Sequence, residues 1–375
     1  MIYYLDQSGQ LGGAELCLAD IARHCGGRVV LLSEGPFVRF LRDHQVEVTT
    51  LPMPGVLSQT TRAAGFREIV MRWPAGLRYV NQLRKALRGA RMLYCNTPKA
   101  LIYGTVANWG SGRPVVFHLH DLLTPQHFSR SNLRLLVMAA NHAQAVIANS
   151  RATADAFRNA GGKTAVTVIP NGFATEPFDT VPLTTIQALR AEFNPENRPV
   201  VAIFGRLARW KGQDVLLRAL HHLPGVMAWV VGDALFTGDD RAYADSLPLI
   251  APAERARFLG FRSDIPALML AADVVVHCSV APEPFGRVLV EGMLARKPVV
   301  AARGGGADEI VEGVGVLLPA GDVDALAQAL RVLTADPELR EAQGRLGRDR
   351  AVSRYGLAGV LDQTTHLLHS LMPAR

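Results

Sequence analysis

Short apolar segments that read as strands alternate with amphipathic segments that read as helices along almost all of the 375 residues. In the first half, strands are expected at residues 2–5, 29–33, 46–51, 92–95, 115–118, 145–148 and 166–169. The connections between them are long enough for crossover helices, so the strands can all run parallel. This alternation predicts a doubly wound α/β sheet.

The second half repeats the alternation. Strands are expected at 200–204, 228–232, 274–277, 298–301 and 316–318, and helices at 213–223, 264–271, 286–295, 323–334 and 338–355. A polar, proline-containing segment separates the halves and predicts a linker near 173–182. Two Rossmann-like domains, 1–175 and 182–355, are therefore expected, followed by an amphipathic helix near 357–371. The 49% hydrophobic content can supply two cores.

Two carboxylates, Glu283 and Glu291, flank the start of the helix expected at 286–295. If the segment is helical throughout, eight steps of about 1.5 Å separate the two acids by roughly 12 Å. The N–H groups near Phe285 and Gly286 would form an anion site at the helix start. Taken alone, two glutamates on a helix are usually solvated surface charges.

A glycine-containing turn with two cations, Arg206 and Lys211, follows the strand expected at 200–204. Ligands of open α/β sheets bind at the carboxyl ends of the strands. There an arginine can hold a phosphate with two hydrogen bonds, and a lysine adds a point charge. The turn predicts a diphosphate clamp, and a solvated basic turn is the alternative.

Eight short motifs occur in a fixed order along nearly the whole chain. They are Gly12-Gly13-Ala14-Glu15, His118-Leu119-His120-Asp121, Ala148-Asn149-Ser150, Ile169-Pro170-Asn171-Gly172, Phe204-Gly205-Arg206 with Lys211-Gly212, Phe258-Leu259-Gly260, the segment from Glu283 to Glu291, and Gly305-Gly306-Ala307-Asp308-Glu309-Ile310-Val311. In this order they resemble glycosyltransferase family 4, whose members are retaining enzymes of the GT-B fold. Single motifs are weak signals, and eight in order are a strong one.

The resemblance implies two Rossmann-like domains that face each other across a cleft, with the final helix packed back on the amino-terminal domain. It also implies transfer of a sugar from a UDP- or GDP-linked donor, with retention of configuration. The acceptor would be a hydroxyl of a glycan, a lipid-linked saccharide or a small molecule, in bacterial polysaccharide or glycoconjugate biosynthesis.

The resemblance assigns roles to individual residues. Glu283 would meet the donor sugar, Glu291 the ribose, and the loop at Gly260 the base. The catalytic candidates are His120, Arg206, Lys211 and Glu283. The donor-binding candidates are Gly12, Gly13, Gly260, Phe261, Arg262, Phe285, Gly286, Arg287, Val288 and Glu291.

Two histidines, His118 and His120, compete for the place near the transferred sugar. They are two residues apart, so on an ideal strand both side chains lie on the same side. The following Asp121 favours His120, and alternation alone leaves the choice open.

Two other classes of protein fit the same scaffold. A nucleotide-sugar epimerase would convert the donor without any acceptor. A catalytically silent glycan-binding or scaffold protein would convert nothing. The ordered motifs and the retained polar residues favour the transferase.

Neither a metal nor another cofactor is expected. Only Asp322-Val323-Asp324 has the Asp-x-Asp spelling that many other glycosyltransferases use to hold a divalent ion. It precedes an apolar helix, so an N-cap and a first-turn acid explain it. The four cysteines have no metal or redox spacing and fit reduced, mostly buried thiols.

The net charge is +7, and its clearest excess lies at residues 62–91, where eight basic residues face one acid and alternate with apolar ones. Such a segment can bind an anionic membrane surface, or it can be two ordinary surface helices separated near Pro74 and Gly76. No nucleic-acid-binding module is recognisable. The amino terminus has neither a signal peptide nor a membrane span, so a cytoplasmic location is expected, at the inner face of the membrane if the basic segment binds lipid.

Overall fold

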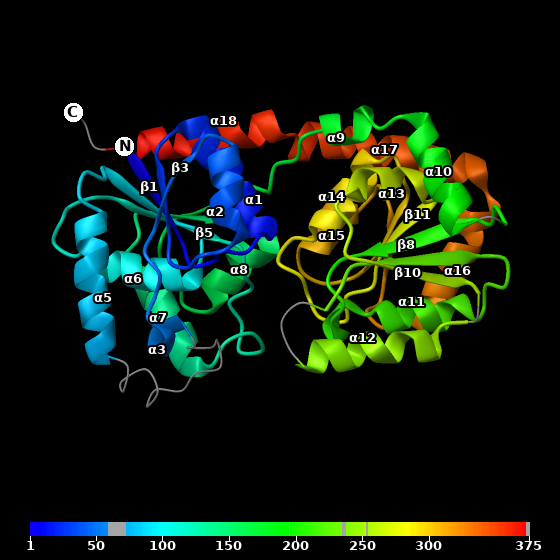
Figure 1. The fold of residues 1–375 in the computed structure, drawn as a ribbon, viewed down its shortest axis with the longest axis horizontal. Helices are drawn as coiled ribbons and strands as arrows, with labels where there is room; N and C mark the ends of the chain where they lie inside the picture. Colours follow the sequence, from blue (N-terminus) through cyan, green and yellow to red (C-terminus); the bar gives the residue numbers. More distant parts are fainter. Residues whose placement is uncertain (59–72, 195, 235–237, 253, 373–375) are drawn as a thin grey trace. The chain divides into compact units, whose positions relative to one another are not determined.

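The computed structural model describes residues 1–58, 73–194, 196–234, 238–252 and 254–372. The chain forms two compact units, one of Met1–Gly172 with Ala358–Arg375 and the other of Phe173–Leu357. Each unit consists of a twisted sheet covered by helices (Figure 1).

The first unit contains a seven-stranded sheet in the order β3-β2-β1-β4-β5-β6-β7, and its paired strands are parallel. The strands are β1 (Ile2–Asp6), β2 (Arg28–Leu31), β3 (Glu47–Thr50), β4 (Met92–Cys95), β5 (Val115–Leu119), β6 (Ala145–Ala148) and β7 (Val166–Val168). Its helices are α1 (Gly13–Cys25), α2 (Pro36–Asp43), α3 (Gly55–Ser58), α5 (Trp73–Ala86), α6 (Pro98–Asn108), α7 (Arg130–Ala140), α8 (Arg151–Asn159) and α18 (Leu357–Ser370). The sequence of the first half predicts all seven strands.

The second unit contains a six-stranded parallel sheet in the order β10-β9-β8-β11-β12-β13. The strands are β8 (Val200–Phe204), β9 (Met227–Val231), β10 (Ala256–Gly260), β11 (Val274–His277), β12 (Val299–Ala302) and β13 (Val316–Leu318). The helices are α9 (Glu176–Asp179), α10 (Leu183–Phe193), the 3-10 turn η1 (Arg209–Lys211), α11 (Gln213–Leu220), α12 (Gly238–Ile250), α13 (Ile265–Ala271), α14 (Arg287–Leu294), α15 (Gly306–Val311), α16 (Val323–Ala335) and α17 (Pro337–Tyr355). The edge strand β10 and the helices α10 and α12 were not expected.

Side chains of β8 alternate between two cores. Val200, Ala202 and Phe204 pack in the cluster on one face of the sheet. Val201 and Ile203 pack in the cluster on the other face. All five are buried, which is why the strand reads as a continuous apolar run.

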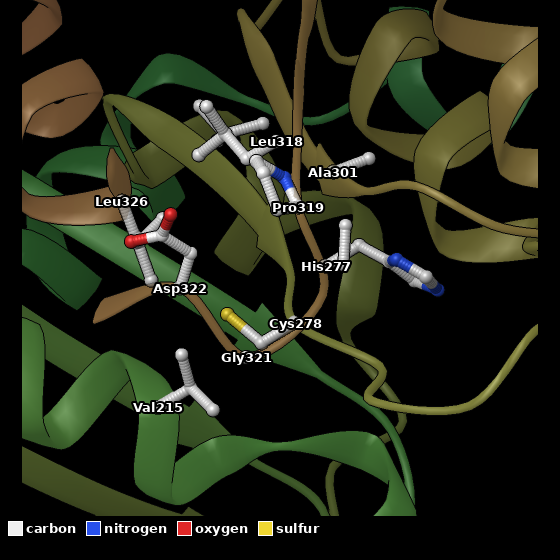
Figure 2. A pocket seen from close by; sticks show the side chains of 11 residues that line it. Val215, His277, Cys278, Ala301, Leu318, Pro319, Gly321, Asp322 and Leu326 are labelled. Atoms are coloured by element: carbon white, nitrogen blue, oxygen red, sulfur yellow. The ribbon is translucent and has the colours of Figure 1, made fainter. Parts of the chain in front are cut away.

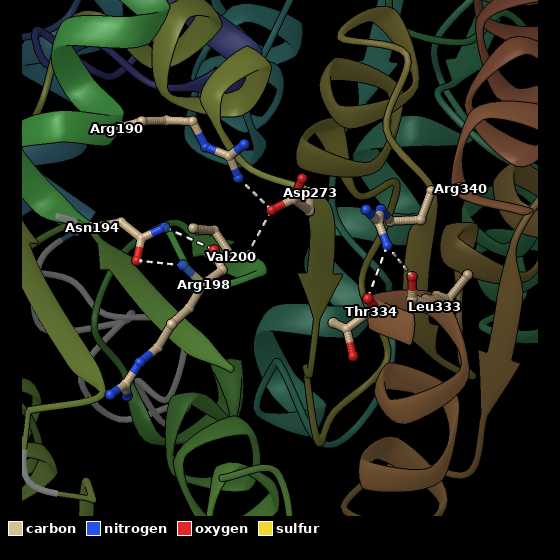
Figure 3. A network of polar contacts seen from close by, with 8 residues as sticks. All are labelled: Arg190, Asn194, Arg198, Val200, Asp273, Leu333, Thr334 and Arg340. Carbon is tan, nitrogen blue, oxygen red and sulfur yellow. Dashed lines mark hydrogen bonds and ion pairs between the residues drawn. The ribbon is translucent and has the colours of Figure 1, made fainter. Parts of the chain in front are cut away.

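The amino end of the second sheet is tied to α10 by Asp273, just before β11. Figure 3 shows its carboxylate between the Arg190 side chain of α10 and the backbone of Val200 at the start of β8. The Val200 N–H donates to Oδ2 at 2.7 Å. This acid therefore fixes the helix to two neighbouring strands at the end opposite their carboxyl termini.

The final helix, α18, belongs to the first unit, as the resemblance implies. Val360, Leu361 and Leu368 of this helix are buried. Cys25 Sγ, at the end of α1, lies 3.2 Å from Thr365 Oγ1. Three of the four cysteines are buried and Cys25 is half-buried. The end of the chain therefore completes the first unit (Figure 1).

One local expectation is wrong. The segment expected as a linker, 173–182, is part of the second unit, because Phe173 and Phe178 are buried in its core. Helix α5 begins at Trp73 and includes Pro74 and Gly76 in its first turn, and the first of the two helices expected in the basic segment lies outside the described residues. A proline in the first turn costs no hydrogen bond. The part of the basic segment at 59–72, with Arg62, Arg67 and Arg72, lies outside the described residues.

Candidate functional site

The sheet of the second unit reverses its strand order at β8, which pairs with β9 on one side and β11 on the other. In open α/β sheets, ligands bind beyond the carboxyl ends of the strands at this switch point. The loop after β8 carries Arg206 and Lys211, and the loop after β11 carries Glu283. The candidate residues thus come from the two loops that the topology brings together.

Glycine and backbone contacts hold these two loops against each other. The N–H of Val280 donates to the Trp210 carbonyl at 2.8 Å. Gly212 has a φ of +69°, and a Cβ on it would lie 2.1 Å from the Cys278 carbonyl oxygen. Only glycine permits this approach, which places Lys211 beside the loop that follows β11.

Three side chains surround one oxygen of Glu283. Its Oε1 pairs with the Lys211 ammonium, accepts from Ser279 Oγ at 2.7 Å and lies 3.2 Å from His277 Nε2. Glu283, His277 and Ser279 are buried, with 6%, 4% and 2% of their surfaces exposed. A buried acid with these donors is an ionised, fixed acceptor.

The electrostatics agree with that geometry. Burial alone would raise the pKa of Glu283, but the charges of Lys211 and His277 and the hydrogen bonds from both outweigh it. The result is a pKa well below the ordinary value for glutamate. Glu283 therefore stays a carboxylate across the physiological range.

Glu283 does not lie on the helix, and this corrects the expected geometry. Helix α14 begins at Arg287, after Gly286 with a φ of +100°. Glu283 instead forms a parallel β-bridge with Gly305, and its carbonyl accepts from the Gly306 N–H at 2.8 Å. The separation of roughly 12 Å assumed a continuous helix and does not apply.

The candidates at and just before the start of α14 are either buried or half-buried. Phe285 is buried against Phe173 and Tyr355, so only its backbone remains for a ligand. Arg287 lies 4.4 Å over the Phe173 ring and 3.4 Å from Glu291 Oε1. Val288 packs partly buried against the same core as Phe285, and Gly286 precedes the first turn. The helix start and the Glu291 carboxylate are therefore on one short element.

Two further candidate groups lie at the same end of this sheet. The Arg206 guanidinium and the Lys211 ammonium lie over the Trp210 ring, at 5.7 and 4.4 Å. Gly260 ends β10, and Phe261 after it is 74% exposed. Arg262 forms two hydrogen bonds with Asp264, at 2.6 and 2.8 Å. That pairing leaves the exposed ring of Phe261, more than Arg262, available to a planar base.

The first unit holds a second set of candidates at its own switch point, where β1 lies between β2 and β4. Gly12 is the N-cap of α1, Gly13 is its first residue, and both are half-buried. His118 is 2% exposed, and its Nδ1 lies 2.6 Å from the Tyr94 hydroxyl. His120 is half-buried and follows the end of β5. Of the two histidines, His120 is the accessible one.

A chain of hydrogen bonds orients His120. The Asn96 amide donates to Asp6 Oδ2 at 2.6 Å and to the Ala14 carbonyl at 3.1 Å. Its other atom, Oδ1, lies 3.0 Å from His120 Nε2. The Asp6 carboxylate and the Ala14 carbonyl are both acceptors, so the Asn96 atom that contacts them is the NH2 group. The remaining atom, Oδ1, is then the acceptor for His120. His120 therefore carries a proton on Nε2.

Asp6 is an unusual carboxyl group, because it is fully buried at the end of β1. Burial and then the charge of Glu15 raise its pKa to about 7, although hydrogen bonds from Ser8, Asn96 and Gln7 lower it. Burial also raises the pKa of Glu15. These two acids sit beside the Gly12–Gly13 turn, where a negatively charged ligand would favour their protonated forms.

Four residues of these two networks were not predicted from the sequence: His277, Ser279, Asn96 and Asp6. Each lies at or just after the carboxyl end of a strand next to a switch point, namely β11, β4 and β1. A polar residue at the carboxyl end of an expected strand is the sequence signal that could have identified them.

A small cavity of about 10 Å³ lies in the second unit beside His277, between β11, β12 and the start of α16. Figure 2 shows that the Cys278 side chain points toward Val215 and Asp322 while the His277 ring points away from them. The cavity has room for about one water molecule and is mostly apolar, so it is not a sugar site.

Asp322 is the N-cap of α16, because its Oδ1 accepts from the Ala325 N–H at 2.9 Å. This confirms the structural interpretation of Asp322-Val323-Asp324. Across the described residues, no cluster of three or more His, Cys, Asp or Glu side chains could hold a metal ion. Within the same part of the chain, no helix is long and apolar enough to cross a membrane.

Comparison with known proteins adds independent evidence. The family model described as "Glycosyltransferase Family 4" matches residues 11–177, and "Glycosyl transferases group 1" matches 186–350. The chain is 39% identical to HepE from Anabaena, solved with UDP and glucose, over 98% of this chain and 99% of that one, with a TM-score of 0.86. It is 30% identical to a GDP-mannose-dependent mannosyltransferase of Mycolicibacterium smegmatis, over 81% of this chain and 78% of the relative.

The chain belongs to glycosyltransferase family 4. Its two Rossmann-like units, with the last helix on the first unit, have the GT-B fold of that family. It is also 28% identical to LpsE, a lipopolysaccharide core biosynthesis glycosyltransferase of Rhizobium meliloti. That match covers 60% of this family 4 chain and 64% of LpsE, which is less than two thirds of the relative.

Proposed function

We propose that this protein transfers a sugar from a nucleotide-diphosphate sugar to a hydroxyl acceptor, with retention of configuration. The observation that carries the proposal is the convergence of Lys211, Arg206 and the ionised, buried Glu283 at the switch point of the second sheet. Cations there suit a diphosphate, and a fixed carboxylate suits the hydroxyls of a sugar.

The donor we propose is a UDP-sugar. HepE, which matches the chain over nearly its full length, was solved with UDP and with UDP-glucose. The Mycolicibacterium relative, at lower identity, uses GDP-mannose, which keeps the guanosine donor as the alternative. The exposed Phe261 after β10 would stack on either base.

In the proposed mechanism the bond between the sugar and the diphosphate breaks while Arg206 and Lys211 stabilise the charge of the leaving diphosphate. The acceptor hydroxyl attacks the sugar carbon from the same face, and the leaving diphosphate takes the hydroxyl proton. No protein nucleophile and no metal ion take part. His120 would hydrogen-bond a sugar hydroxyl, and Glu291 would accept from the ribose.

Mass spectrometry of the full-length protein with a panel of UDP- and GDP-sugars, with and without mixed glycan and lipid-linked acceptors, tests the proposal. A sugar-transfer product that forms only with an acceptor, and still forms in EDTA, supports it. Conversion of the donor alone indicates an epimerase. Binding of glycan without conversion of any donor indicates a silent glycan-binding protein.

We propose that the first unit contacts an anionic membrane through the basic segment 62–91, mainly by charge. In α5 and the turn after it, the apolar residues Tyr79, Val80, Leu83 and Leu87 are buried in the core of the first unit. The basic side chains Arg78, Arg84, Lys85 and Arg88 of the same segment are exposed. The described part of the segment therefore offers a lipid surface mainly charge, with Leu77 an exposed apolar side chain on the helix.

Sedimentation with vesicles containing anionic lipid tests that contact. Reversing Lys85 and Arg88 to glutamate should lower binding at low salt, and added salt should abolish it. Equal binding by the wild type and the variant would remove the membrane proposal and leave the transferase proposal unaffected.

A further inference from the structure

The single positive charge of Lys211 has two anionic groups to neutralise. In this structure its ammonium neutralises Glu283. If the protein is the transferase proposed above, the same ammonium must stabilise the donor diphosphate. Because a diphosphate carries more charge than one carboxylate, Lys211 shifts toward it when donor binds. The buried Glu283 carboxylate then depends on other hydrogen-bond donors to stabilise its charge.

Two neighbouring side chains can supply them. Ser279 Oγ donates to Glu283 Oε1 at 2.7 Å, and His277 Nε2 lies 3.2 Å from the same oxygen. An ionised carboxylate only accepts, so His277 must carry the proton on Nε2. Both residues are more deeply buried than Lys211, whose side chain is 20% exposed.

His277 is held rigidly. It is the last residue of β11, and its backbone pairs with Ala301 of β12 in the interior of the sheet. The alternation of the strand sends its ring away from Cys278 and the small cavity (Figure 2). A ring fixed on a central strand can fix the carboxylate that it contacts.

Stability of the fold does not explain a histidine here. Among the described residues, Nδ1 of its ring has no hydrogen-bond partner, although the atom is buried. A buried nitrogen without a partner destabilises the folded state. An apolar residue would end β11 at lower cost, which points to a role in the site.

The two oxygens of Glu283 face different surroundings. Oε1 is surrounded by Lys211, His277 and Ser279. Oε2 lies toward Gly286, 4.0 Å from where a Cβ on that glycine would be, at the start of α14. Holding Oε1 therefore decides what Oε2 can reach.

We propose that His277 and Ser279 are positioning residues, which hold Oε1 of Glu283 after Lys211 turns to the diphosphate and so aim Oε2 at the sugar of the bound donor. This inference rests on the proposed function. It predicts that the two residues matter for the sugar part of the donor and for turnover, and not for the nucleotide part.

Calorimetry and steady-state kinetics on the full chain test it, with UDP and with the UDP-sugar that binds best in a panel. His277→Leu should bind UDP within about twofold of wild type and lose roughly tenfold in UDP-sugar affinity and tenfold to a hundredfold in kcat. Ser279→Ala should show the same pattern more weakly. His277→Gln keeps a donor near Nε2, so it should recover most of the lost kcat.

Cys278→Ala is the matched control, because this residue follows His277 in the chain and its side chain points into the small cavity, away from the His277 ring (Figure 2). It should leave both affinities and kcat unchanged. Should His277→Leu fail to fold, as judged by lost UDP binding, Ser279→Ala and His277→Gln carry the same comparison.

The outcomes separate this inference from the proposed function. A wild type that binds UDP and turns over a UDP-sugar, with His277→Leu and Ser279→Ala equal to it, overturns the positioning role alone. Equal loss of UDP and UDP-sugar affinity in Ser279→Ala overturns it also, since that is a general structural effect. A wild type that binds no nucleotide overturns both.

Discussion

At the residue scale, the pairing of Lys211 with Glu283 makes a specific prediction for the charge itself. Lys211→Ala should lower turnover by about a hundredfold to a thousandfold, the range seen when one donor to a developing anion is removed. Initial rates at saturating donor measure the effect. Arg209→Ala is the control, because this exposed arginine lies on the same turn and its guanidinium packs 5.4 Å over Tyr243. Comparable rates in both variants would contradict the role of Lys211.

A second residue-scale prediction concerns Asp6, whose pKa is raised to about 7 in the folded protein and is about 4 in an unfolded chain. The folded state then binds more protons between these values. The contribution of Asp6 to stability is therefore full below pH 4 and is lost as the pH rises through 7. Asp6→Asn removes this titration, so the fall in Tm between pH 5 and pH 8 should be smaller by about 3 °C or more.

Thermal unfolding at the two pH values measures this difference. The asparagine also loses one of the two hydrogen bonds that Asp6 accepts from Ser8 and Asn96, so its Tm should be lower at pH 5. Asp155→Asn, at an exposed acid of α8, should keep the wild-type difference. If the Tm of Asp6→Asn also falls between pH 5 and pH 8 by as much as that of the wild type, Asp6 is ionised in the folded protein at both pH values.

At the scale of elements, the loop between β12 and α15 fixes the position of Glu283. Gly305 has a φ of +72°, and a Cβ on it would lie 1.9 Å from the Glu283 carbonyl oxygen. Gly313 has nearly the same φ, +77°, with no atom within 4 Å of such a Cβ. Gly313→Ala should cost about 1–2 kcal/mol of stability, the ordinary strain of a left-handed backbone.

Gly305→Ala adds a backbone clash to that strain, so it should destabilise the second unit further and displace Glu283. Denaturant unfolding gives the stability, and the rate of sugar transfer reports the displacement. Both substitutions place alanine at a positive φ, and the ψ of −140° at Gly305 adds strain beyond the left-handed helical region, so their difference combines that strain with the contact with Glu283. Equal stability and equal rates would show that the loop relaxes without moving the acid.

Much of the arrangement of elements could be predicted because parallel strands buried on both faces read as continuous apolar runs, as β8 does. The missed strand, β10, is an edge strand in which Phe258 and Gly260 are exposed, so it lacks such a run. One of the missed helices, α10, follows a polar segment that resembles a linker. It is anchored by the ion pair from Arg190 to Asp273, a contact across 83 positions that no local pattern reveals.

The site was predictable to the level of loops. Motif order selected Lys211 and Glu283, and the structure brings their side chains together. The helical estimate for Glu283 was wrong because Gly286, in a left-handed conformation, turns the chain before the helix begins. His277 and Asn96 were missed because their importance lies in which atoms they contact, and those contacts join separate strands.

At the scale of the whole molecule, the chain passes from the first unit to the second after Gly172 and returns after Leu357. The first unit is therefore complete only when the last helix, α18, has packed on it. Residues more than 350 positions from β1 contribute to the same folded unit. The stability of the first unit thus depends on the end of the chain.

Leu368→Ala tests this dependence, because Leu368 of α18 is fully buried. The cavity should destabilise the first unit by about 2–5 kcal/mol. Hydrogen exchange should then speed up in β1 and β4 while β8 and β11 keep their protection, since only the first unit loses packing. His366→Ala, at an exposed site on the same helix, should change stability by at most about 0.5 kcal/mol. Faster exchange in both sheets would mean that the two units unfold together. Unchanged exchange in β1 and β4 would mean that the first unit does not depend on α18.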